Sequence, residues 1–141
     1  MKLTHQVARL AFTLGVALSL SLLGSMAAAA DLKLSGDTEV PAVKTMASGI
    51  STIAIAADGA VTGSVKTTGV AGTAAHIHVG AAGKNGPVII PLTKGAEGEW
   101  SVPPGAKLTD EQMKSFKSGE LYVNVHSEAN KGGEIRAQLT R

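Results

Sequence analysis

The stretch Thr73-Ala-Ala-His76-Ile77-His78-Val79-Gly80 decides the fold. Its alternation of polar and apolar residues predicts a β-strand, in which successive side chains point to opposite faces of a sheet. Ile77 and Val79 then share one face, and His76 and His78 share the other. Two imidazoles spaced two residues apart on one strand face can bind the same metal ion.

A second stretch carries the only other histidine outside the first thirty residues. Glu120-Leu-Tyr-Val-Asn-Val-His126 alternates in the same way and predicts another strand. Its leucine and valines fall on one face, and Tyr122, Asn124 and His126 fall on the other. Because the aliphatic faces supply the core, we expect the imidazoles to be exposed and the core not to depend on them.

His76, His78 and His126 are therefore the candidate metal ligands. Imidazoles suit copper, zinc and nickel, and the lack of cysteine and of many candidate carboxylates favours a copper ion, with zinc as the second choice. The site requires the two strands to lie close together. In the alternative interpretation, the three histidines are surface residues on solvated strand faces.

Three further residues are candidates for contacts with the metal ligands. Asn124 lies on the polar face beside His126, and Glu128 follows two residues later, although Glu128 is alternatively a solvated loop acid. Arg136, on the polar face of the last strand, either guides anions toward a metal or covers the sheet. Met46 is interpreted as a partly buried core residue rather than a thioether ligand.

The first thirty residues are typical of a secretory signal peptide. A basic start and an apolar run over residues 10–23 precede a small-residue cleavage-type site at Ala28-Ala29-Ala30. A membrane anchor is the alternative, but the run is short for a bilayer span. We expect residues 1–30 to be removed and residues 31–141 to act in the periplasm or as a secreted protein, with no membrane span.

The charge and the cysteine count exclude several function classes. The 141-residue chain has 13 basic and 11 acidic residues, but Lys2 and Arg9 are the only charged residues of the first thirty. The rest of the chain is therefore balanced and lacks the basic excess that nucleic-acid binding requires. The absence of cysteine excludes a thiolate ligand, a catalytic thiol and disulfide bonds.

Short alternating runs separated by turn residues predict strands along the rest of the chain. Asp58-Gly59 lies between two such runs, residues 49–57 and 60–68, and this pair is typical of a β-hairpin. Other predicted strands lie at residues 31–35, 87–92, 97–102 and 134–139. The regular spacing of the runs favours a sandwich or barrel.

One segment predicts a helix. Thr109-Asp110-Glu111-Gln112 is a capping box, with acids in the first turn and a glycine stop at Gly119. We predict an all-β fold, a Greek-key β-sandwich or flattened barrel of about seven or eight strands, with one short helix near residues 109–118.

No catalytic residue is assigned from the sequence. Ser127 neighbours His126, but adjacent strand residues point to opposite faces and cannot form a nucleophile–base pair. The glycines at 80, 83 and 86 lead into a strand, whereas a phosphate-binding loop leads into a helix. The sequence therefore gives no positive indication of an enzyme.

The assembled motifs resemble the chordin-type (CHRD) domain family. The segments that carry the resemblance are His76–Gly80, Asn85–Ile89, Gly119–His126 and Asn130–Leu139, with Glu39-Val-Pro41 and Gly49. It covers nearly all of residues 31–141. It implies one β-sandwich-like CHRD domain over residues 31–141, of a kind common in exported bacterial proteins, without a settled activity.

The same motifs are similar to part of the copper–zinc superoxide dismutases. His76, His78 and His126 resemble three copper ligands of those enzymes, and Arg136 resembles their active-site arginine. Residues 80–86 contain no histidine where the metal-bridging one would lie, and the zinc ligands are missing. The resemblance implies a copper site without full dismutase chemistry.

Together these observations predict an exported copper-binding domain that handles or buffers copper. Its expected partners are the metal ion and other periplasmic or extracellular proteins. One alternative is a structural or protein-interaction CHRD module, in which the histidines bind no metal. A third is a superoxide dismutase-like redox enzyme. The metal content of the purified protein distinguishes the first two.

Overall fold

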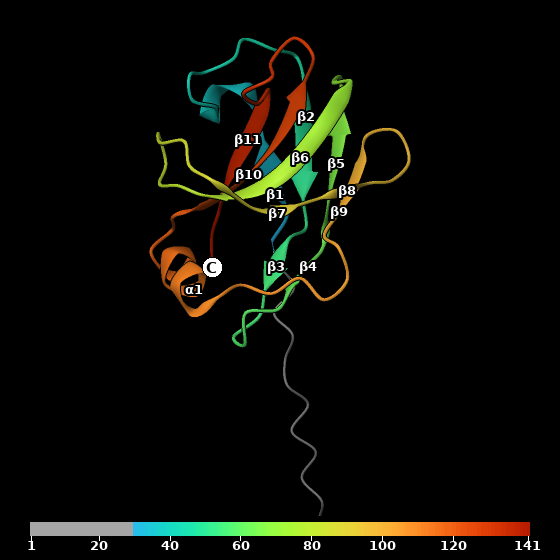
Figure 1. Ribbon diagram of the computed structural model, residues 1–141. Coiled ribbons are helices and arrows are strands. Elements are labelled where there is room, and N and C mark those ends of the chain that lie inside the picture. Colours follow the sequence, from blue (N-terminus) through green and yellow to red (C-terminus); the bar gives the residue numbers. More distant parts are fainter. Residues whose placement is uncertain (1–29) are drawn as a thin grey trace, which may run out of the picture.

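The computed structural model describes residues 30–141, whose strands pair into three antiparallel sheets (Figure 1). The five-stranded sheet has the order β1 (Leu32–Leu34), β2 (Ser48–Ser51), β5 (Ser64–Thr68), β9 (Glu99–Ser101) and β8 (Thr93–Lys94). The four-stranded sheet has the order β11 (Ile135–Leu139), β10 (Leu121–Ser127), β6 (Gly72–Val79) and β7 (Val88–Pro91). A separate ribbon contains β3 (Ala54–Ile55) and β4 (Val61–Thr62), and the helices are η1 (Gly36–Thr38) and α1 (Asp110–Lys117).

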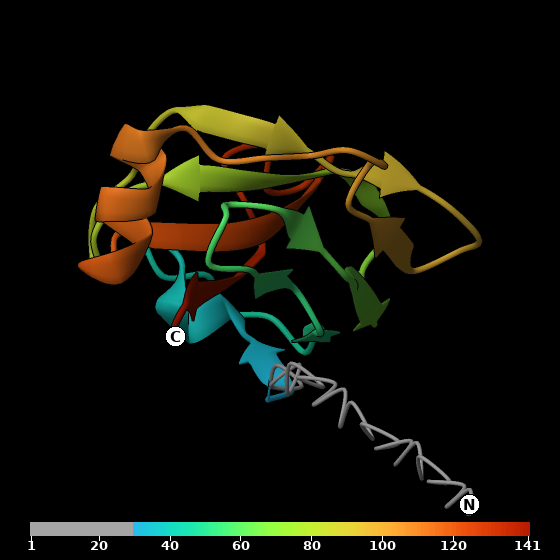
Figure 2. The same cartoon turned by 90° about the horizontal axis from the view of Figure 1, so that it is seen from below.

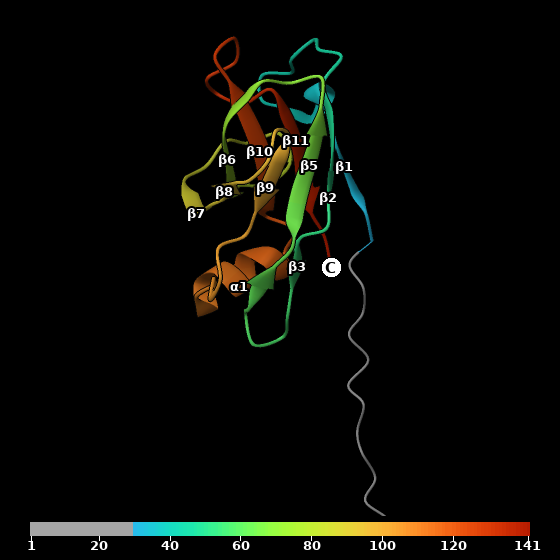
Figure 3. The ribbon, with the colours of Figure 1, turned by 90° about the vertical axis from the view of Figure 1, so that its right-hand side faces the viewer.

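The two large sheets lie on opposite sides of the core, which Figure 3 shows with β6 and β7 on one side and β5 and β2 on the other. The five-stranded sheet contributes Val65 and Trp100, and the four-stranded sheet contributes Ile77, Val123 and Ile135. Each of these side chains is at most 3% exposed. The predicted all-β sandwich is confirmed, and the alternating aliphatic residues form its core.

The predicted hairpin around Asp58-Gly59 is confirmed, but its strands are shorter than expected. β3 pairs with β4, and β2 pairs separately with β5. The break falls at Gly63, whose φ of +109° is in the region that favours glycine, and a Cβ at this position would clash with the Thr52 carbonyl oxygen. This division is one reason why residues 30–141 contain eleven strands rather than seven or eight.

The predicted helix is confirmed together with its capping box. The Thr109 side chain accepts a hydrogen bond from the Gln112 backbone N–H at 3.2 Å, and the Thr109 N–H donates to the Gln112 side chain at 2.9 Å. α1 lies at one end of the sandwich, close to the C-terminal residue (Figure 2). Phe116 anchors it to the core. No helix within residues 30–141 is long and apolar enough to cross a membrane.

The outer face of the four-stranded sheet carries the predicted polar side chains, but much of it is covered. Tyr122, Asn124 and Arg136 are at most 2% exposed. The loop over residues 80–87 lies against this face, since the Ala81 carbonyl accepts a hydrogen bond from Arg136 Nη2 at 3.1 Å. The predicted alternation is confirmed, whereas the expectation of exposed polar side chains is wrong for the centre of this sheet.

The predicted signal peptide at residues 1–30 lies, except for Ala30, outside the described residues. The structure therefore describes the segment that the sequence assigns to the exported domain. The chain enters this domain at β1, on the edge of the five-stranded sheet.

Candidate metal centre

The strands that carry the three histidines are direct neighbours. β6 pairs with β10 in antiparallel register, with Asn124 opposite His76 and Tyr122 opposite His78. His126 lies two residues beyond Asn124 on the same face, diagonal to His76, and diagonal neighbours are within reach of long side chains. The structure thus brings together all three candidate ligands.

The ring nitrogens of His76, His78 and His126 converge. One nitrogen from each ring lies within 4.8 Å of the others. His76 Nδ1 is 3.0 Å from His126 Nε2, and the ring centroids of His76 and His78 are 5.5 Å apart. A metal ion bound at about 2.0–2.1 Å from each nitrogen needs only small side-chain rotations to fit among them.

Two of the rings have their second nitrogen fixed by a backbone carbonyl. His78 Nδ1 lies 2.9 Å from the Gly86 oxygen, and His126 Nδ1 lies 2.8 Å from the Lys131 oxygen. A carbonyl oxygen can only accept, so both Nδ1 atoms carry a proton. In the neutral rings, Nε2 of His78 and of His126 is then free to bind a metal, and the carbonyls set the ring orientations.

His76 differs from the other two candidate ligands, because it faces them with Nδ1 rather than with Nε2. In the tautomer that donates Nδ1–H to the Lys131 carbonyl, His126 Nε2 is the acceptor, so His76 Nδ1 donates the hydrogen bond that joins the two rings. Binding a metal at His76 Nδ1 therefore requires the proton of that ring to move to Nε2. The ligand atoms that the geometry offers are His76 Nδ1, His78 Nε2 and His126 Nε2.

His78 Nε2 is one of four buried side-chain atoms without a hydrogen-bond partner within residues 30–141, together with Glu39 Oε1, Trp100 Nε1 and Asn124 Oδ1. Of these four atoms, it is the one that belongs to the histidine cluster. An unpaired buried polar atom costs about 1–3 kcal/mol, and a metal ion among the three rings would use its lone pair. The donor set of three nitrogens without thiolate or carboxylate fits copper or zinc.

The electrostatic environment favours the neutral, metal-binding form of His76 and His78. Burial lowers the pKa of His76, and its neighbours His126 and His78 lower it further by charge repulsion. Burial also lowers the pKa of His78, against the hydrogen bond to the Gly86 carbonyl, which raises it. Both rings are therefore neutral at neutral pH, as a metal ligand must be.

The His78 ring is held from one side by a buried stack. It lies parallel to the Tyr122 ring, with centroids 4.6 Å apart and planes 5° apart. β6 and β11 flank β10 on opposite sides, so Tyr122 lies between His78 and Arg136, whose Cζ is 3.4 Å from the Tyr122 centroid. The Tyr122 hydroxyl also accepts the Gly86 N–H at 3.1 Å. Tyr122 thus contacts both the ligand ring and Gly86, the residue whose carbonyl orients that ring.

The loop that orients His126 is anchored by a second group of polar contacts. Ser127 Oγ donates to the Glu134 carboxylate at 2.5 Å and accepts the Asn130 N–H at 3.2 Å. Thr45 Oγ1 donates to the other Glu134 oxygen at 2.6 Å. These bonds tie the two ends of the loop together and so fix the Lys131 carbonyl beside the ring.

The three residues predicted to contact the metal ligands are Asn124, Arg136 and Glu128, and they differ in burial. Asn124 is buried in the strand position between His76 and Arg136. Arg136 is 1% exposed and donates to the Ala81 carbonyl, the Asn85 side chain and the Gln138 side chain, so its guanidinium is engaged inside the protein. Glu128 is exposed and pairs with Lys131 at 3.7 Å.

Sequence reasoning missed some residues of the centre and misplaced another. The Gly86 and Lys131 carbonyls lie in loops, and no residue pattern indicates where a loop carbonyl points. Tyr122 shares the polar phase of His126, which was a usable signal. Met46, expected to be partly buried, is 96% exposed, although the next residue, Ala47, belongs to the core.

Fold and site together define a β-sandwich domain with a three-histidine cluster on the outer face of one sheet. The model of the CHRD domain family matches residues 31–139, and the chain belongs to this family. No curated protein and no solved structure matches the chain. The resemblance to copper–zinc superoxide dismutases therefore rests on the sequence motifs around the three histidines and Arg136 alone.

Proposed function

We propose that this CHRD domain binds one copper ion through His76, His78 and His126, and that it handles or buffers copper after export. The observation that carries the proposal is the convergence of the three ring nitrogens. Three neutral imidazoles bind Cu(II) more tightly than Zn(II) in the general order of divalent-metal affinities. Zinc is therefore the weaker choice for the same ligands.

The exposure of the ligands suits uptake and release of the ion. His78 is buried, but His76 and His126 are only half-buried. An ion among them is reachable from solvent on one side and is held by a rigid strand pair on the other. Bound copper would supply ligand exchange and one-electron chemistry, while the protein supplies the orientation of the rings.

The geometry gives less support to the two alternative functions, a dismutase-like enzyme and an interaction module without metal. A dismutase-like enzyme would use a cation near the metal to attract its anionic substrate, but Arg136 is buried under Tyr122 and the 80–87 loop. An interaction module without metal does not require the three ring nitrogens to converge.

Thermal unfolding of the untagged protein, with and without Cu(II), tests the proposal. At a free Cu(II) concentration of about 100 times Kd the stabilisation is about 2.7 kcal/mol, which raises Tm by roughly 10 °C. His76→Ala, His78→Ala and His126→Ala should each lose most of this shift. Thr73→Ala, an exposed change on the same strand β6, should keep it.

The outcomes separate the candidates. A wild-type Tm that copper does not move removes the copper proposal and favours the interaction module. Histidine variants that respond to copper like the wild type place the metal elsewhere in the protein.

A further inference from the structure

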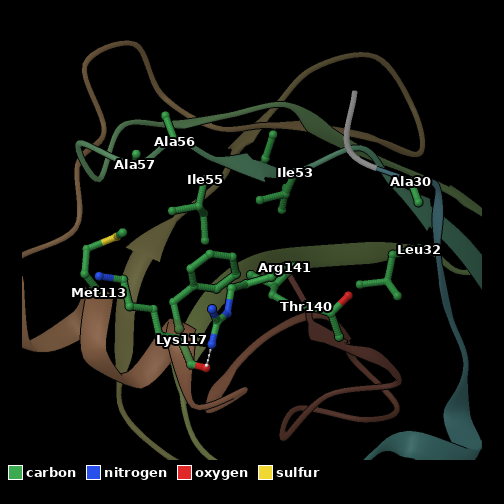
Figure 4. A pocket seen from close by; sticks show the side chains of 13 residues that line it. Ala30, Leu32, Ile53, Ile55, Ala56, Ala57, Met113, Lys117, Thr140 and Arg141 are labelled. Carbon is green, nitrogen blue, oxygen red and sulfur yellow. Dashed lines mark hydrogen bonds between the residues drawn. The ribbon is translucent and has the colours of Figure 1, made fainter. Parts of the chain in front are cut away.

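A cavity separate from the histidine cluster opens at the end of the sandwich where α1 lies (Figure 4). Its volume is about 590 Å³, within the range of about 300–1,000 Å³ that is typical of small-molecule sites. Apolar side chains from the two sheet edges, the β3 segment and α1 form most of its wall: Leu32, Ile53, Ile55, Met113, Phe116 and Leu139.

The fold explains why space remains at this end. The chain leaves the five-stranded sheet after β2 and forms the β3–β4 ribbon, which lies at the same end of the molecule as α1 (Figure 1). α1 has only eight residues and carries one buried side chain, Phe116. The ribbon and the helix therefore stand beside each other with the cavity between them, as Figure 4 shows for Ile55 and Met113.

The wall of the cavity runs from the core to the surface. Phe116 and Leu139 are 7% and 3% exposed, whereas Ile55 and Met113 are half-buried. An apolar occupant would contact core side chains at one end and would remove the half-buried ones from water. Burial of apolar surface stabilises a complex by about 25 cal/mol per Å² before the costs of association.

The charged side chains of the lining have one sign. Lys117 and Arg141 line the cavity, and no acidic residue within 30–141 does. Arg141 Nη2 donates to the Lys117 carbonyl at 2.7 Å, which holds the guanidinium beside the end of α1 (Figure 4). The lining thus combines an apolar wall with two cations, which complements a ligand with an apolar tail and one negative head.

We propose that this cavity binds a free alkyl carboxylate of the fatty-acid class. The alkyl chain lies against Ile55, Met113 and Phe116, and the carboxylate lies beside Lys117 and Arg141. A slim, flexible tail fits a cavity whose deepest wall is core, whereas a protein surface would meet only the rim. The site is independent of copper.

Calorimetric titration of the purified protein with decanoate and with decan-1-ol tests the head and the tail separately. Decanoate should bind saturably at one site, and decan-1-ol, which has the same chain without the charge, should bind more weakly. The double change Lys117→Gln and Arg141→Gln removes two exposed ion pairs and should weaken the binding of decanoate by roughly twofold to thirtyfold. The affinity for decan-1-ol should stay unchanged. Lys114→Gln, an exposed lysine on the same helix outside the lining, is the matched control.

Met113→Trp tests the position of the site by filling the cavity. It should weaken both ligands by at least about tenfold, while the copper-free protein still unfolds cooperatively. The proposal is overturned by the absence of saturable binding, by equal affinity for decanoate and decan-1-ol, or by full affinity in Met113→Trp. A dimer that Met113→Trp dissociates would show that a second copy of the chain occupies the cavity, and would overturn it as well.

Discussion

At the scale of single residues, the three histidines have unequal roles in the fold. His78 is 7% exposed, is stacked on Tyr122 and is hydrogen-bonded to the Gly86 carbonyl, while His126 is half-buried. In metal-free protein with chelator, His78→Ala should lower the free energy of unfolding by about 1–3 kcal/mol, and His126→Ala by less. Denaturant unfolding measures both, and equal losses would contradict the unequal burial.

Tyr122 is expected to control copper affinity without binding the ion. Tyr122→Phe keeps the ring beside His78 but removes the hydroxyl that accepts the Gly86 N–H. Tyr122→Leu removes both contacts. Outer residues that orient metal ligands change affinity by about 10- to 100-fold, so Kd for Cu(II) should rise modestly in the first variant and more in the second. Competition titrations with a chelator of known affinity check the order, and unchanged Kd values in both would exclude this role.

The buried imidazoles also predict a pH dependence of the copper-free fold. The pKa values of His76 and His78 are lowered in the folded state, so the unfolded chain binds protons more readily. Their contribution to stability is complete above the unfolded pKa of about 6.5 and is lost as pH falls toward the folded values. Burial raises the pKa of Glu39, which acts with the opposite sign.

The difference between wild type and the double variant His76→Gln and His78→Gln isolates the histidine contribution. Melting temperatures between pH 7.5 and pH 5 should fall less steeply in the variant. Parallel pH profiles for the two proteins would show that these imidazoles titrate alike in the folded and unfolded chain.

At the scale of elements, α1 depends on its capping box. Thr109→Ala removes the side chain that accepts the Gln112 N–H and should cost about 1 kcal/mol of stability. Lys114→Ala, exposed on the same helix, should change stability by less than about 0.5 kcal/mol. Chemical denaturation compares the two. Copper affinity should be unchanged in both variants, because α1 contributes no ligand.

Elements also show what the sequence could and could not predict. Alternation placed His76, His78 and His126 on polar strand faces, and the Thr109 and Asp58-Gly59 signals located the helix and the hairpin. Alternation reports only which side chains share a face, so it did not reveal that the 80–87 loop covers the Arg136 face. The break at Gly63 was equally hidden, because one glycine inside a strand pattern does not show where the chain leaves a sheet.

At the scale of the whole molecule, the first prediction concerns processing. The basic start, the apolar run and the small residues up to Ala30 are typical of a cleaved signal peptide. Protein recovered after export should therefore begin at or within a few residues of Asp31. Intact-mass measurement decides this, and a full-length chain in the exported fraction would contradict it.

The assembled site depends on two neighbouring strands that are remote in sequence, and on two loop carbonyls that lie eight and five residues from the rings they orient. The register between β6 and β10 brings His126 to His76, fifty residues earlier in the chain. Neither strand specifies this pairing by itself, since the partner of a strand is set by the whole sheet. The candidate ligands were therefore predictable as a group, and their convergence was visible only in the fold.

A crystal structure of the protein with Cu(II), with anomalous diffraction recorded above and below the copper absorption edge, tests the central claim most directly. We predict a single copper peak bound by His76 Nδ1, His78 Nε2 and His126 Nε2, at the distance of about 2.0 Å that is usual for imidazole ligands. A copper peak at any other position, or no peak among the three rings under saturating Cu(II), would contradict it.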